Sequence, residues 1–110
     1  MSFDWISILQ AAYAAAKPLI ANTSKDAQAF VKMELAGFAH RVEEFGSLVI
    51  SGDVKSMDEA KAWLAGEIGQ MKVDLAIAEG IGEIIAEQVA NAQMTVGLAV
   101  LGALPKAIGL

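Results

Sequence analysis

The chain has 110 residues, of which 55% are hydrophobic and 19% charged, with a net charge of −5 and no cysteine. This length fits one domain, and the apolar content excludes disorder over the whole chain. The lack of cysteine excludes disulfides and thiolate metal sites. No basic cluster stands out against the acidic balance, so we expect no nucleic-acid partner.

The first apolar run, "WISILQAAYAAA", is not typical of a secretory signal peptide. Asp4 is the only charge before it, and no lysine or arginine precedes it. We therefore expect a protein that stays in the cytoplasm or within an assembled particle. Association with a membrane is left open by this pattern.

The first expected helix covers about residues 3–20. Its apolar residues follow spacings of 4, 3, 4 and 3, which place them on one helical stripe. These residues are Trp5, Leu9, Ala12, Ala16 and Leu19. Pro18 should kink this helix or end it near Ala16, because proline clashes with the preceding helical turn.

The second expected helix covers about residues 24–50, with Thr23 or Ser24 as its N-cap. The apolar stripe again alternates spacings of three and four and contains two phenylalanines. Its members are Ala27, Val31, Leu35, Phe38, Val42, Phe45 and Val49. Ser51 and Gly52 should end this helix.

The third expected helix covers about residues 57–104. It begins with a capping box, since Glu59 follows Ser56 by three residues. An apolar stripe then runs from Leu64 to Ala103 and keeps its 4-3 alternation through Gly80 and Gly82. The unbroken phase predicts one continuous helix with coiled-coil-like packing.

The glycines leave an alternative open. A turn at Gly80–Gly82 would divide the third helix into two and give a compact four-helix bundle. The sequence thus predicts a single all-α domain over residues 1–110. The favoured form is an elongated antiparallel helical hairpin with a long C-terminal helix and an N-terminal helix; the compact bundle is the alternative.

The end of the chain is its most apolar part. Residues 94–104 carry no charge and are apolar or small all round, which is typical of a helix buried in protein or lipid. This run is short of the roughly 20 residues that a membrane span needs. We expect contact with another copy or with lipid through five residues: Val89, Val96, Leu98, Leu101 and Leu104.

No motif for catalysis, cofactor binding or metal binding is found. His40 is the only histidine, and His-x-x-Glu occurs once, whereas ferritin-like di-iron sites repeat Glu-x-x-His on two helices. Glu79, Glu83 and Glu87 repeat every four residues, as on a solvated helix face. We therefore expect no enzyme activity, no cofactor and no metal.

Three functional hypotheses follow. The first is a structural protein that forms homo-oligomers or packs on a larger particle, for which a small viral or phage virion component is one suitable context. The second is a membrane-active protein that inserts residues 88–110. The third is a compact bundle that holds a small apolar ligand.

Overall fold

The computed structural model describes residues 4–54 and 56–107, with side chains through Leu104. The described residues form four α-helices and one short 3-10 helix, without a strand, which confirms the all-α prediction. The elements are α1 (Trp5–Ala16), η1 (Lys17–Leu19), α2 (Lys25–Ser51), α3 (Met57–Ile77) and α4 (Gly82–Ala107).

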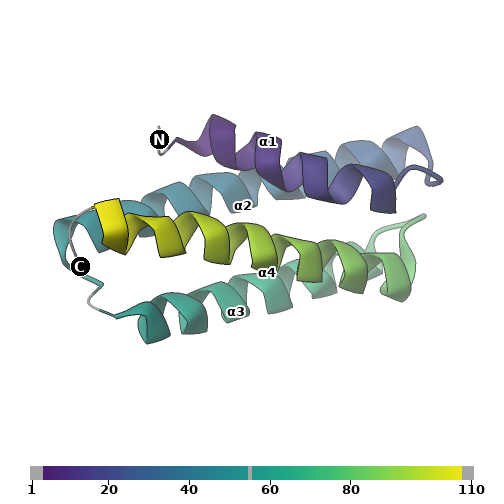
Figure 1. Cartoon of the computed structure of the whole chain (residues 1–110). Coiled ribbons are helices and arrows are strands. Elements are labelled where there is room, and N and C mark those ends of the chain that lie inside the picture. Colours follow the sequence, from purple (N-terminus) through teal and green to yellow (C-terminus); the bar gives the residue numbers. More distant parts are fainter. Residues whose placement is uncertain (1–3, 55, 108–110) are drawn as a thin grey trace.

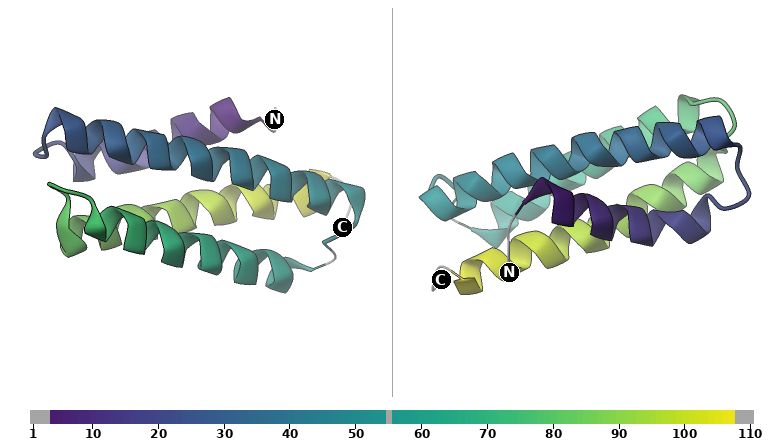
Figure 2. Two further views of the ribbon diagram at one scale, coloured as in Figure 1. Left: turned by 180° about the vertical axis from the view of Figure 1, so that it is seen from behind. Right: turned by 90° about the horizontal axis from the view of Figure 1, so that it is seen from above.

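The helices pack side by side in a bundle that measures 44 × 23 × 17 Å. Successive helices run in opposite directions (Figure 1). The α1–α2 connection and the α3–α4 turn lie at one end of the bundle, and the α2–α3 loop lies at the other (Figures 1 and 2). Each helix can therefore present an apolar stripe to one shared core.

Side-chain and glycine caps define the helix ends. Asp4 accepts a hydrogen bond from the Ser7 N–H at 2.7 Å, and Ser24 and Ser56 cap α2 and α3 in the same way. Gly52 ends α2 in the left-handed region, with φ of 87°. These caps satisfy backbone groups that a helix terminus leaves without intrahelical partners.

Pro18 ends the first helix as the sequence predicts. The α-helix stops at Ala16, and Pro18 lies inside η1 rather than in a longer α-helix. The chain then turns at residues 20–24, where the Thr23 hydroxyl donates to the Ile20 carbonyl at 2.7 Å. The first helix is thus shorter than the expected range of 3–20.

The prediction of a continuous helix over residues 57–104 is wrong, and the four-helix alternative is correct. Ala78 adopts an extended backbone with ψ of 139°, and Gly80 and Gly82 have φ of 85° and 80°. Glycine takes this left-handed conformation without the steric penalty of a Cβ. A helix over 57–104 would be about 70 Å long, whereas the turn lets α4 fold back along α3.

The four helices do not approach one another equally. The α3–α4 pair packs most closely, and α1 packs against both α2 and α4. The α2 and α3 backbones approach each other at few points, so long side chains bridge most of the space between them. Chain neighbours α2 and α3 therefore form the most open seam of the bundle.

Apolar residues from every helix fill the core. Phe38, Leu35, Leu64, Leu75 and Leu101 are among the largest side chains that are fully buried. The sequence-derived stripes of α2 and α3 thus form the core as expected.

Gln93 is the one buried polar side chain among the described residues. Its Nε2 donates to the Ala12 carbonyl at 3.0 Å and so joins α4 to α1, while its Oε1 has no hydrogen-bond partner.

Gly97 explains how closely α3 and α4 approach. A Cβ placed on Gly97 would lie 2.6 Å from Leu64 Cδ1 and 2.8 Å from Leu64 Cδ2. Leu64 is fully buried, so its side chain has little room to move away. The hydrogen atom of glycine is therefore required at this contact.

We expect Gly97→Ala to lower the free energy of unfolding by about 1–3 kcal/mol, despite the better helix propensity of alanine. Gly102→Ala is the matched control on the same helix, because a Cβ there meets nothing within 4 Å. The control should be neutral or stabilising by up to about 1 kcal/mol. Urea denaturation followed by circular dichroism measures both. Equal stability of the two variants would contradict the packing at Gly97.

Candidate interaction surface

The apolar residues predicted to contact another molecule lie mostly inside the bundle. Val89, Leu101 and Leu104 are buried, and Val96 and Leu98 pack partly buried against the core. The α3–α4 turn brings this stripe against the other helices of the same chain. Contact of these five residues with a second molecule stays a prediction, but the other helices of the same chain already cover much of the surface of their side chains.

Helix α4 has the length and composition of a membrane span. Among the described residues, only the segment Gly82–Leu104 is both long enough and apolar enough to cross a membrane. Of its most apolar 18-residue stretch, 39% is buried in the bundle. Core helices of soluble proteins show the same character, so this feature alone does not distinguish a core helix from a membrane helix.

The solvent-facing side of α3 is unusually apolar. The core side carries Leu64, Ile68, Met71 and Leu75. The opposite side carries uncharged residues at spacings of 4, 3, 4 and 4, and we call it the α3 outer face. Its members are Ala62, Gly66, Gly69, Val73 and Ile77, all of them exposed. Val73 and Ile77 keep 54% and 79% of their surface in solvent.

Nothing within the described chain accounts for the two glycines of the α3 outer face. A Cβ at Gly66 or at Gly69 would meet no atom within 4 Å, and neither residue has a positive φ. Each glycine inside a helix costs about 1 kcal/mol relative to alanine. A close approach by another molecule is a physical reason for both.

A second exposed apolar feature follows directly after α3. Ile84, in the first turn of α4, is 75% exposed, whereas Ile81 is buried. A shallow apolar depression of about 570 Å³ is lined by Ile81, Gly82, Glu83, Ile84 and Ile85. Large apolar residues thus occur on both sides of the α3–α4 turn.

An open groove of about 630 Å³ runs along the seam between α2 and α3. Helix α2 contributes Glu34 and Arg41 to this groove. Helix α3 contributes the rest of the lining: Ala62, Trp63, Gly66, Glu67, Gln70 and Asp74. Because Ala62 and Gly66 also belong to the α3 outer face, the groove and that face are continuous.

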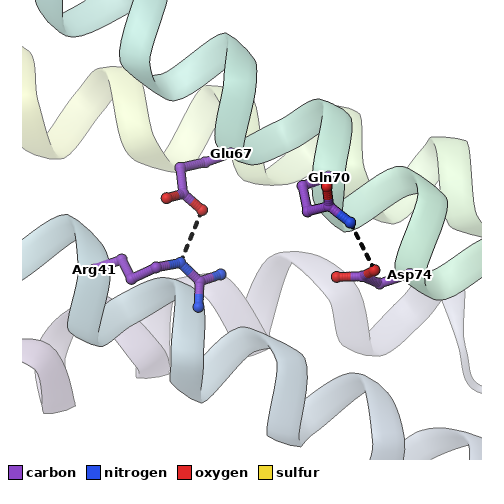
Figure 3. Close-up of polar contacts among 4 residues, drawn as sticks. All are labelled: Arg41, Glu67, Gln70 and Asp74. Atoms are coloured by element: carbon purple, nitrogen blue, oxygen red, sulfur yellow. Dashed lines mark hydrogen bonds and ion pairs between the residues drawn. The ribbon is translucent and has the colours of Figure 1, made fainter.

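One ion pair spans the groove. The Arg41 Nε donates to Glu67 Oε2 at 2.8 Å, and no other ion pair joins α2 to α3 within the described residues (Figure 3). On the next turn of α3, the Gln70 amide donates to Asp74 Oδ1 at 2.9 Å (Figure 3). Arg41 is therefore engaged by Glu67, and Asp74 is oriented by its neighbour on the same helix.

Aromatic stacking closes the seam beyond this ion pair. The rings of Phe45 and Trp63 lie parallel, with centroids 4.2 Å apart. A smaller pocket of about 180 Å³ adjoins them and is also lined by Leu48 and Glu44. The groove thus has a polar part beside Glu34 and Asp74 and an apolar end beside Trp63 and Leu48.

Glu34 in the groove has a pKa that is clearly displaced. Burial raises the pKa of Glu34 above its ordinary value of 4.5, the negative charge of Asp74 raises it further, and Arg41 opposes the shift. No described residue donates a hydrogen bond to its carboxylate. The charge of Glu34 is therefore poorly compensated at neutral pH.

His40 belongs to a contact between α1 and α2. Its ring stacks on Trp5 with centroids 4.0 Å apart, and the Trp5 backbone N–H donates to Glu43 Oε2 at 2.8 Å. No group of three or more His, Asp or Glu side chains among the described residues is arranged to hold a metal ion. His40 and Glu43 therefore anchor the start of α1.

The groove could not be located from the sequence. Glu34, Glu67 and Asp74 look like ordinary solvated positions of amphipathic helices, and Trp63 looks like a core anchor. The detectable signal was in α3, where apolar and small residues occupy both sides of the helix.

No family model, curated protein or solved structure matches this chain.

We expect Glu34→Gln to raise the melting temperature at pH 7. A raised pKa means that the folded state favours the protonated carboxyl, so ionised Glu34 destabilises the fold and its protonation at lower pH stabilises it. The gain in melting temperature should shrink as the pH falls through the titration range of Glu34. It should vanish once Glu34 is protonated in both the folded and the unfolded state of the wild type. Thermal melts at several pH values measure this. Glu44→Gln is the control, because it removes the same charge from an exposed residue of α2.

Proposed function

We propose that this is a non-enzymatic structural protein that self-associates through the α3 outer face. The observation that supports the proposal is the apolar, uncharged side of α3 with its two unexplained glycines. A helix that is apolar on both sides is typically covered on both sides. Within the described chain, α3 is covered on its core side alone.

A second copy fits this face by size. In an antiparallel pair of α3 helices with Gly66 opposite Gly69, Ala62 would lie opposite Val73. Val73 then meets a small residue, and glycines at the centre allow the helix axes to approach closely, whereas Ile77 lies opposite Asp58 at the edge of the contact. A parallel pair would place Val73 and Ile77 against themselves and hold the helices apart at one end.

The expected interface is small. Helix α3 has 21 residues and is about 30 Å long, so one of its faces offers less than the roughly 800 Å² per partner of a standard interface. Such a contact is weak in isolation. It suits repeated packing in a larger particle, such as a viral or phage virion, where many copies act together.

We expect the double variant Val73→Asp/Ile77→Asp to weaken self-association by about tenfold or more, because two carboxylates would be buried at the interface. Size-exclusion chromatography with light scattering over a concentration series measures this. Ile6→Asp/Met33→Asp is the matched control, since both residues are exposed apolar side chains outside the α3 outer face. A wild-type chain that stays monomeric at high concentration contradicts the proposal.

The glycines provide a variant that separates folding from assembly. Gly66→Ala/Gly69→Ala should stabilise the single chain by up to about 2 kcal/mol through helix propensity, since both added Cβ atoms point into open space. The same methyl groups should weaken self-association by holding the two helices apart. A variant that is more stable and also more strongly associated would exclude close helix packing at this face.

We propose membrane insertion of α4 as the second candidate function, because Gly82–Leu104 has the length and apolar character of a span. In this alternative the bundle opens and α4 exchanges its protein contacts for lipid. The buried Oε1 of Gln93 has no hydrogen-bond partner, which costs stability in the closed bundle, whereas the bond from its Nε2 to the Ala12 carbonyl opposes opening.

We expect Thr95→Asp to abolish vesicle binding if α4 inserts. Thr95 is exposed in the bundle, so the folded chain should tolerate aspartate, whereas aspartate near the centre of a membrane helix costs about 2.5–3.5 kcal/mol. Flotation with phosphatidylcholine and phosphatidylglycerol vesicles measures binding, and Ala29→Asp on α2 is the control. Failure of the wild type to float with either vesicle would exclude this function.

A further inference from the structure

We propose that the groove between α2 and α3 binds an amphipathic helix of a partner protein, with lysine or arginine residues along one flank. This site adjoins the self-association surface proposed above and shares Ala62 and Gly66 with it, but binding there does not require a second copy of the chain. The shape of the groove, its apolar end and its charge each contribute to the inference.

The shape of the groove leaves room for a backbone. Its floor on the α3 side is formed by Ala62 and Gly66, which are exposed, and a Cβ at Gly66 would contact nothing within 4 Å. The groove lies between two helices whose backbones approach each other at few points. An added helix could therefore contact α2 and α3 together, as amphipathic helices do in apolar grooves.

The apolar end of the groove offers an anchor point. Trp63 is half-buried and covered on one ring face by Phe45, which holds it in place. Leu48 lies at the same end and is 45% exposed. A preorganised aromatic ring beside an exposed leucine is suited to an apolar side chain of the partner.

The charge of the groove indicates the flank of the partner helix. Three carboxylates line the main groove, and the single cation, Arg41, is already paired with Glu67. The negative charges of Glu34 and Asp74 repel each other across the seam, Arg41 only partly offsets this repulsion at Glu34, and Glu44 adds another carboxylate at the apolar end. A lysine or arginine placed between Glu34 and Asp74 would relieve their repulsion.

The same charge argues against other occupants. Nucleic acid and anionic lipid would be repelled by these carboxylates. Two copies docked groove to groove would bring Glu34 and Asp74 of both chains together, in a protein whose net charge is −5. A basic partner helix removes the repulsion that each of these alternatives would increase.

The test uses a synthetic helical peptide of about 18 residues, some 27 Å long, with leucine on one face and lysine along one flank of that face. Fluorescence anisotropy of the labelled peptide, titrated with the full chain, should show micromolar binding. The same peptide with glutamate in place of lysine should not bind. Absence of binding by the lysine peptide, even at low ionic strength, would overturn the proposal.

Charge-matched variants separate the groove from general attraction to an acidic protein. Glu34→Gln/Asp74→Asn should weaken peptide binding by about tenfold, whereas Glu79→Gln/Glu83→Gln, with the same charge change at exposed positions outside the groove, should change it less than about twofold. Equal losses in both double variants would mean nonspecific attraction and would refute the site.

A third pair of variants tests the apolar end. Leu48→Asn should weaken binding by about fivefold, whereas Met33→Asn, an exposed apolar residue of α2 outside the groove lining, should have little effect. Light scattering on the same samples reports self-association separately. Peptide binding should persist in a monomeric chain, so failure of either proposal can be recognised without the other.

Discussion

The left-handed glycines of the α3–α4 turn are the constraint on which the rest of this structure depends. Gly80 and Gly82 reverse the chain within a few residues, so that α4 lies along α3 instead of extending it. The reversal brings the most apolar part of the chain into the core of the same molecule. Without it, the stripe of α4 would need a second molecule or lipid to cover it.

Close packing of α3 on α4 determines where the bundle is open. Gly97 lets α4 approach Leu64 more closely than any side chain would allow. With α3 held against α4, its distance from α2 is bridged by long side chains, namely the Phe45–Trp63 stack and the Arg41–Glu67 ion pair. The groove between α2 and α3 is a consequence of this unequal packing.

Helix α3 connects the fold to the proposed functions because it is apolar on its core side and also on its outer face. Most exposed helix faces are charged, and glycine is uncommon in helix interiors because it costs stability. Gly66 and Gly69 weaken α3 as an isolated helix without a compensating contact inside the chain. Self-association at the outer face and binding of a basic helix in the adjoining groove would both make use of this surface.

Local features of the sequence determined the helices, but tertiary packing determined their arrangement. The caps at Ser24, Ser56 and Gly52 and the break at Pro18 follow from short-range sterics and hydrogen bonds, and so they were predictable from the sequence. Apolar periodicity gives the face that a helix buries, but not the direction in which the chain continues. The stripe therefore kept its phase through Gly80 and Gly82 although the helix ends there. The groove depends on the distance between α2 and α3, which follows from how all four helices pack, including the close α3–α4 contact at Gly97, and no local pattern encodes such a distance.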